Sequence, residues 1–303
     1  MDVDLPLAIA GLVVGLTVGL TGMGGGALMT PLLVLLFKVE PFAAVSSDLV
    51  ASFVMKPVGG GVHLRRGTVN LRLVGWLCVG SIPAAFAGVL LLKSLGNDEG
   101  LQDTIKVLLG VALLVAASTI VAKAAVQRRR AIASGNGDHL SVANVAVRPL
   151  PTVAIGVLGG LIVGMTSVGS GSLMIVLLLF LYPRLTTKSL VGTDLVQAIP
   201  LVGSAAAGHL LFGDFRLDVA AWLLVGALPG VYVGARMSAA APDRVIRPVL
   251  CVVLVASGLK LLDVPTAAIG LALAVGVAAG IGVVTWRRRA SLRTAEPAPA
   301  LAE

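Results

Sequence analysis

The stretch GLTGMGGGALMTP, at residues 19–31, gathers five glycines near the beginning of a strongly apolar chain. Such a cluster is typical either of a phosphate-binding loop or of a break in a membrane helix. A phosphate-binding loop ends in Gly-Lys-Ser/Thr after a strand, and no lysine follows Gly26. The stretch recurs at residues 164–174 as GMTSVGSGSLM, where no lysine follows Gly171 either. The phosphate loop is therefore disfavoured, and the two clusters indicate breaks in equivalent membrane segments.

The composition is that of a polytopic membrane protein. Of 303 residues, 57% are hydrophobic and 13% are charged, and the mean hydropathy is +1.00, which is too apolar for a soluble domain. The net charge of +8 comes from short Lys and Arg runs between apolar segments, so we expect orientation signals and no nucleic-acid partner. Cys78 and Cys251 lie inside apolar segments and do not form a metal motif. We expect no metal and no cofactor.

The chain is two copies of one unit. A shift of 145 aligns the glycine clusters, and a shift of 146 aligns SSDLV at residues 46–50 with GTDLV at residues 192–196. From residue 63 to residue 88, ten of 26 positions match the second copy, among them His63 with His209. We therefore predict two transmembrane repeats. The expected parts are a first repeat (1–122), a basic cytoplasmic linker (123–150), a second repeat (151–264), an extra helix (265–286) and a flexible tail (287–303).

Loop charge predicts that the two repeats have opposite orientations. Basic loops stay in the cytoplasm; the loop at residues 63–72 is basic, whereas its equivalent at residues 209–218 is net negative. The linker and the tail are also basic. We expect an all-α protein of the cytoplasmic (inner) membrane, with its N-terminus outside and its C-terminus inside. Two inverted repeats are typical of secondary transporters, whose site lies between the halves near the midplane.

The apolar segments that follow the glycine clusters are too short to cross a bilayer. Those at residues 27–37 and 172–182 have 11 residues each, and at about 1.5 Å per residue they cannot span a core of about 30 Å. We predict broken or re-entrant helices; helix packing through a GxxxG spacing, as in Gly22 and Gly26, is the alternative. A restarting helix offers free N–H groups and a positive dipole end to an anion. The expected substrate contacts there are Gly24, Gly25, Gly26, Gly169, Ser170 and Gly171.

Lys56 is the most informative single residue. It lies in DLVASFVMKPVGG at residues 48–60, and its repeat equivalent is Val202. Because a lysine inside an apolar segment is costly to bury, it either attracts an anion or extends its ammonium toward the loop at Arg65. Other polar side chains on these two segments are expected to hydrogen-bond the substrate: Ser47, Thr193 and Gln197. A helix–helix hydrogen bond is the alternative for Gln197.

Four titratable residues recur at equivalent positions and are candidates for ion coupling: Asp48, Asp194, His63 and His209. Each aspartate either caps the start of a helix or relays a proton or a cation inside the membrane. The histidines precede glycine-containing turns, which favours interfacial caps over proton carriers. An intramembrane serine protease, with Ser170 as nucleophile and His209 as base, is disfavoured because Ser170 aligns with Gly25. We expect no enzymatic activity.

The order of these motifs resembles the sulfite exporter TauE/SafE family, also called TSUP, over residues 7–262. In the first half the resemblance rests on GLTGMGGGALMTP, SSDLV, Lys56, His63, Arg66-Gly67 and Val69. In the second half it rests on GTDLVQAIPL, Gly208-His209-Leu210, Gly213-Asp214 and ALPGVYVG. The chain departs from the family pattern at Ser46, where a Gly is usual, and at Met55, where a Thr commonly precedes the Lys.

The resemblance implies a permease that moves sulfite, sulfonates or related small organic anions across the cytoplasmic membrane, often as an exporter. We therefore expect a small anionic substrate, a lipid bilayer around the helices, and alternating access driven by the proton gradient. A passive anion channel and a membrane sensor or scaffold for sulfur compounds are the alternatives. The sequence leaves a homo-oligomer open.

Overall fold

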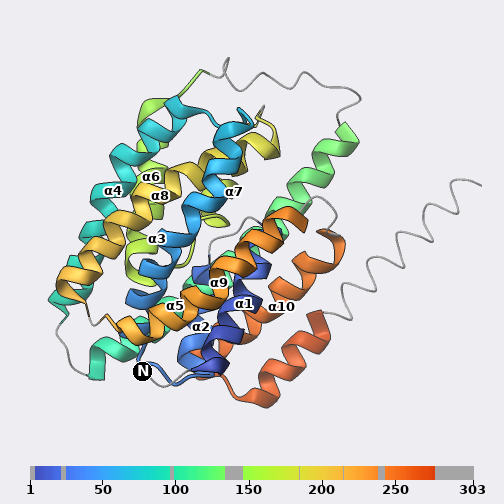
Figure 1. Ribbon diagram of the computed structural model, residues 1–303. Coiled ribbons are helices and arrows are strands. Elements are labelled where there is room, and N and C mark those ends of the chain that lie inside the picture. Colours follow the sequence, from blue (N-terminus) through green and yellow to red (C-terminus); the bar gives the residue numbers. More distant parts are fainter. Residues whose placement is uncertain are drawn as a thin grey trace, which may run out of the picture. The chain divides into compact units, whose positions relative to one another are not determined.

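The computed structural model describes residues 4–21, 25–95, 99–133, 146–183, 185–213, 215–237 and 243–276. These residues contain no strand. They form two compact units, residues 1–262 and residues 263–303, and the second holds a short apolar helix, Thr266–Gly276. The helices of the first unit (Figure 1) are α1 (Leu5–Thr21), α2 (Gly26–Leu35), α3 (Pro41–Arg65), α4 (Leu71–Ser94), α5 (Glu99–Ala133), α6 (Pro149–Thr166), α7 (Leu173–Leu181), α8 (Thr187–Phe212), α9 (Leu217–Met237) and α10 (Asp243–Leu261).

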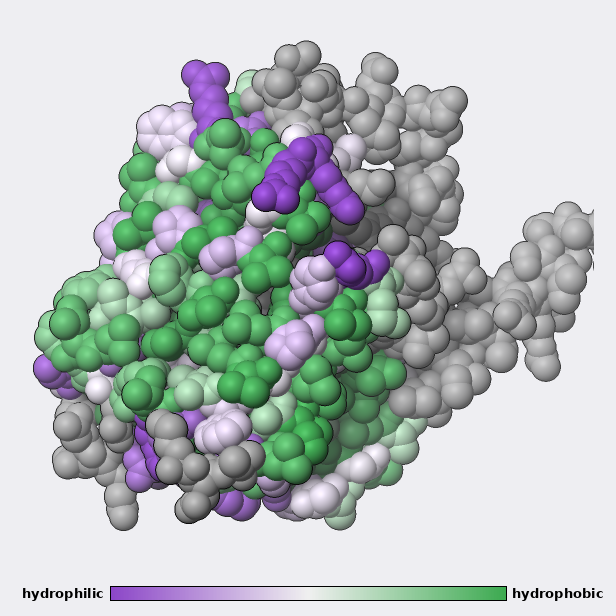
Figure 2. Space-filling model, in the orientation of Figure 1, coloured by the Kyte–Doolittle hydropathy of each residue, from purple (hydrophilic) through white to green (hydrophobic). Residues whose placement is uncertain are grey.

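The helices are long and apolar enough for a membrane. Within the described ranges, six candidate spans lie in α3, α4, α5, α6, α8 and α9. Large hydrophobic side chains such as Val79, Val107 and Val225 are exposed on the outside of these helices. Figure 2 shows one face that is mostly hydrophobic, with hydrophilic residues gathered toward its margins. Because lipid rather than water suits such a surface, the chain is an all-α polytopic membrane protein, as its composition predicted.

The helices of the two sequence copies pack in equivalent cross pairs. In the repeat alignment α6 is the equivalent of α1, and α9 is the equivalent of α4. α1 lies along α9, and α4 lies along α6. α3 packs on its own equivalent α8, and α5 packs on α10. These main pairings of one copy are thus repeated by the other, as expected for two copies related by a twofold axis.

Glycines bring the cross pairs into backbone contact. A side chain at Gly11, Gly15 or Gly19 of α1 would collide with backbone atoms of α9. The equivalent glycines of α6, at positions 156, 160 and 164, meet the backbone of α4 in the same way. Small residues at every fourth position let two helices approach closely and gain dispersion contacts. Glycine-mediated packing therefore holds the first helix of each copy to the fourth helix of the other copy.

Both predicted short helices are present. α2 has 10 residues and α7 has 9, so neither exceeds about 15 Å, which is half the thickness of a bilayer core. Between α6 and α7 the chain passes through Gly169 and Gly171, each at φ 112°, a conformation that glycine adopts without steric strain. Gly22 and Gly24, from the first cluster, lie outside the described residues.

Two expectations about helix ends need correction. The prediction that Asp48 and Asp194 cap helix starts is wrong, because α3 and α8 begin several residues earlier, at Pro41 and Thr187. The N-cap of α8 is Thr186, whose side chain accepts a hydrogen bond from the backbone N–H of Ser189. α5 continues as a helix to Ala133, into the range expected to be linker.

Candidate functional site

Lys56 lies inside α3, and its ammonium is directed at the second helix break. The side chain is only 7% exposed, and its Nζ donates a hydrogen bond of 2.9 Å to the Oγ of Ser170. Ser170 is also buried and precedes α7. The interpretation that the ammonium of Lys56 extends toward the loop at Arg65 is therefore wrong. A cation is instead held between the two sequence copies.

Two buried carboxylates lie around this cation. Asp48 on α3 and Asp194 on α8 are both enclosed, and both interact electrostatically with the ammonium of Lys56. Neither carboxylate forms an ion pair with Lys56 among the described residues. With all three groups ionised, one positive and two negative charges give a net charge of −1. This cluster therefore opposes a further anion unless a carboxylate is neutralised.

Hydroxyl groups surround the carboxylate of Asp48. Thr30 Oγ1 donates to Oδ2 at 2.7 Å, and Ser52 Oγ donates to Oδ1 at 3.3 Å. Ser167, from the other break, also acts on this carboxylate. None of these three residues was predicted from the sequence. The i,i+4 spacing of Ser52 from Asp48 was a usable signal, whereas Thr30 and Ser167 become neighbours only through the tertiary fold.

Asp194 has no such partners. Both of its carboxylate oxygens are buried and accept no hydrogen bond from any described residue. The repeat equivalents of Thr30 and Ser52 are Ile175 and Ala198, which have no hydroxyl groups. The second copy has therefore kept the acid and lost the donors that satisfy it in the first copy.

Gln197 lies one turn after Asp194 on α8 and is fully buried. Its Nε2 donates a hydrogen bond of 2.7 Å to Ser81 Oγ on α4. Its Oε1 has no hydrogen-bond partner within the described part of the chain. The helix–helix alternative for Gln197 is thus confirmed for the amide nitrogen, while the amide oxygen stays available to another donor.

The two breaks meet each other beside these groups. A Cβ at Gly25 would lie 3.3 Å from Ser52 Oγ and 3.7 Å from Asp48 Oδ1. A Cβ at Gly26 would overlap the backbone of Ser167 in the second break. Only a small residue permits this approach, so Gly26 is a close packing contact between the two copies. Gly22, the other residue of the GxxxG spacing, lies outside the described residues.

The hydroxyls of Ser47 and Thr193 contact helix starts in the opposite copy. Ser47 Oγ donates to the carbonyl oxygen of Arg216 at 3.4 Å, just before α9. Thr193 Oγ1 accepts a hydrogen bond of 3.1 Å from the backbone N–H of Asn70, just before α4. Residues 70 and 216 are repeat equivalents. These two hydroxyls thus form a symmetric pair of links between the copies, and their contact with a substrate stays a prediction.

The two histidines differ in their surroundings. His209 is completely buried, with Nδ1 2.8 Å from Ser46 Oγ and Nε2 2.9 Å from the carbonyl oxygen of Gly164. The expectation of an interfacial cap is therefore wrong for His209, which links α8 to α3 and α6. His63 is partly exposed, and its Nδ1 lies 3.0 Å from Thr68 Oγ1.

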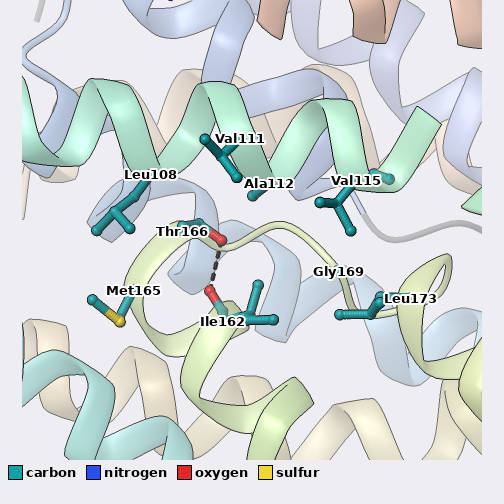
Figure 3. Close-up of a pocket in the computed structure, with 10 residues that line it drawn as sticks. Leu108, Val111, Ala112, Val115, Ile162, Met165, Thr166, Gly169 and Leu173 are labelled. Carbon is teal, nitrogen blue, oxygen red and sulfur yellow. Dashed lines mark hydrogen bonds between the residues drawn. The ribbon is translucent and has the colours of Figure 1, made fainter. Parts of the chain in front are cut away.

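A separate cavity of about 140 Å³ lies between α5 and the α6–α7 segment. Figure 3 shows side chains of α5 on one side of it and residues of α6 and the following break on the other. Its lining is almost wholly apolar, and Thr166 Oγ1, its one hydroxyl, donates to the carbonyl oxygen of Ile162 at 2.6 Å. No charged side chain lines it, so this cavity does not suit an anion.

The profile of the family described as Sulfite exporter TauE/SafE matches residues 7–261 of the chain. The chain belongs to this family. This TauE/SafE member is 35% identical over 260 residues to the probable membrane transporter protein YjnA of Bacillus subtilis (strain 168), covering 86% of this chain and 100% of that protein. It is 26% identical over 250 residues to the probable membrane transporter protein YdhB of the same organism, covering 82% and 96%. No solved structure matches it. As a TauE/SafE member, the chain is a membrane permease.

Proposed function

We propose that this permease is a secondary transporter that exports sulfite, sulfonates or related small sulfur-containing or organic anions across the cytoplasmic membrane. The matching family is described as a sulfite exporter, and the similar proteins are described as probable membrane transporters. The substrate would bind between the two repeats, near the breaks before α2 and α7. Inverted repeats with broken helices support alternating access around such a site.

The observation that carries this proposal is the buried ammonium of Lys56 beside Ser170. An ammonium has three N–H donors, and within the described residues Ser170 accepts from one of them. A sulfite or sulfonate group offers several acceptor oxygens to the others, in a medium where charge-assisted hydrogen bonds are strong. Gly25 and Ser170 occupy equivalent positions in the two breaks, so an anion there would contact both copies.

The first prediction is that Lys56→Met abolishes anion transport. We would measure uptake of radiolabelled sulfite, sulfoacetate and thiosulfate into proteoliposomes, with and without a pH gradient. The wild type should show saturable flux of at least one anion, and Lys56→Met should lose it because the buried cation is gone. Lys106→Met is the matched control, since Lys106 is exposed and pairs with Asp103 at 3.0 Å.

Flux that survives Lys56→Met would contradict the role of Lys56, and no flux of any of the three anions would contradict the substrate class. Preloaded unlabelled anion should accelerate uptake of the labelled anion, because a transporter exchanges its substrate across the membrane. A passive channel would lack this acceleration. Vesicles of both orientations, compared under one imposed gradient, would test the direction of export.

A further inference from the structure

The described part of the chain leaves three buried side-chain acceptor atoms without a donor, and all three lie on one face of α8. They are the two carboxylate oxygens of Asp194 and the Oε1 of Gln197. Residues three apart on a helix are neighbours on its surface. A buried carboxylate without hydrogen bonds is strongly disfavoured, so this pair is incomplete as it stands. Asp194 and Gln197 lack a hydrogen-bond donor. A fully ionised anionic substrate carries no hydrogen that it could donate to them.

A single proton completes the pair. Bound to one oxygen of Asp194, it turns an acceptor into an O–H donor. Among the described residues, the other buried side-chain acceptor without a partner is Oε1 of Gln197, on the same helix face. The amide of Gln197 is held in position because its Nε2 donates to Ser81. Asp48 needs no such proton, because Thr30 and Ser52 already donate to both of its oxygens.

We propose that Asp194 takes up the coupled proton of this transporter and that its protonated carboxyl donates to Gln197, whereas Asp48 stays ionised. The proton comes from water on one side of the membrane and returns to water on the other, with no change of oxidation state. This inference rests on the proposed function in one respect: the proposed function supplies the anion whose transport is coupled to the proton. The repeat-related acids then have different roles, because the second copy lacks the hydroxyls of the first.

The surrounding charges link the proton to the anion. Lys56 on α3 and Lys123 on α5 act on Asp194, and His63 of α3 lies beside Gly192, one half-turn earlier on α8. α6 and α7 contain no titratable side chain, and the basic side chains of α4 are exposed. Protonation of Asp194 changes the net charge of Lys56 and the two aspartates from −1 to 0, which favours an anion beside Lys56. Proton and anion therefore bind together, and the protein is a symporter. Export is then driven by the gradient of the accumulated anion, and not by the proton gradient, which was expected from the sequence.

Infrared difference spectroscopy of the purified protein at high and low pH tests the proton site without any substrate. The wild type should gain the carbonyl band of a protonated carboxylic acid as the pH falls from about 8 to about 5.5, a range in which exposed Asp and Glu side chains stay largely ionised. Asp194→Asn should lose this band and Asp48→Asn should keep it. Gln197→Leu should retain the band but shift it, because the acceptor of the new O–H is gone; this variant also serves if Asp194→Asn does not fold.

Anion binding provides the second readout. Sulfoacetate is the ligand for this test, because its charge stays constant near neutral pH whereas sulfite itself takes up a proton there. Linkage of one proton tightens wild-type binding of sulfoacetate by at most about tenfold for each unit of pH decrease. Asp194→Asn should bind sulfoacetate with no pH dependence over the same range, and a pH gradient should no longer drive uptake of sulfoacetate. Asp48→Asn should keep the pH dependence.

A band that persists in Asp194→Asn, or that sodium abolishes at constant pH, would overturn the proton site. So would sulfoacetate binding that stays pH-dependent in Asp194→Asn. A wild type that transports none of the anions but shows the band, lost in Asp194→Asn, would refute the proposed function and leave the proton site intact. If the wild type transports an anion but shows no carboxylic-acid band and no pH dependence of binding, the proton site is refuted and the proposed function stands.

Discussion

At the scale of single residues, Asp48 shows how a buried acid is stabilised by short side chains from other elements. Its carboxylate accepts hydrogen bonds from Thr30 on α2 and from Ser52 on its own helix. Each donor replaces part of the hydration that the carboxylate loses on burial. Stability at this point therefore depends on residues with no charge of their own.

We predict that Thr30→Val destabilises the protein by about 1–3 kcal/mol, because it keeps the shape of the side chain and removes a donor to a buried charge. The midpoint of detergent-induced unfolding measures this. Thr119→Val is the control, since the hydroxyl of Thr119 donates only to the carbonyl of Ala116 in its own helix. An equal loss in both variants would contradict the assigned role of Thr30.

The sequence identified the charged and amide groups of the site but not the hydroxyls around them. Lys56, Asp48 and Asp194 stand out because a charge inside an apolar segment is expensive. Serine and threonine carry no such penalty and occur throughout membrane helices, so Thr30 and Ser167 could not be selected before the fold was known. For the same reason, the sequence could not reveal that Asp194 lacks partners.

At the scale of helices, glycine positions on one helix differ sharply in what surrounds them. On α4, a Cβ at Gly80 would meet the carbonyl oxygen of Val153 and lie 2.9 Å from the backbone nitrogen of Val157. At Gly75 of the same helix a Cβ would meet nothing within 4 Å. The first glycine is needed for packing against α6, and the second is not.

Gly80→Ala should therefore destabilise the protein by about 1–3 kcal/mol, because α4 and α6 must separate. Gly75→Ala should be neutral or stabilise it by about 0.5–1 kcal/mol, since alanine favours a helix over glycine. Unfolding midpoints of the two variants, measured in the same detergent, test the pair. Similar midpoints would show that the close approach of α4 and α6 contributes little.

The short helices α2 and α7 could be predicted from the sequence, whereas the residue at which α3 starts was predicted wrongly. Segment length and the repeated glycines indicated α2 and α7 correctly. The cap expected at Asp48 was wrong because a proline is already suited to the first turn of a helix, where its missing N–H is not needed. Pro41 at the first position of α3 was therefore the better signal.

At the scale of the molecule, inverted repeats predict that equivalent loops lie on opposite sides of the membrane. In a chain with Cys78→Ala and Cys251→Ala, Arg66→Cys should react with a membrane-impermeant thiol reagent from the cytoplasmic side. Arg216→Cys should react only from the other side. Labelling of both positions from one side would refute the inverted arrangement and, with it, the proposed alternating access.

The duplication was evident from the sequence, but the pairing of helices between the copies was not. Alignment shows which segments are equivalent, and it does not show which of them touch. The glycines at every fourth position of α1 and α6 were a usable signal of close packing, but they were not among the residues selected from the sequence. Their partners α9 and α4 became known only from the structure.

The first helix of each copy packs against the fourth helix of the other copy, and this arrangement also sets the order in which the helices can assemble during synthesis. α1 ends at Thr21, and its partner α9 does not begin until Leu217, so the glycine face of α1 stays uncovered while most of the chain is still being made. α6, by contrast, finds α4 already in the membrane when it emerges. A nascent chain that stops before α9 would therefore present an unmatched helix face to the membrane's quality-control proteases, although its second cross pair is complete.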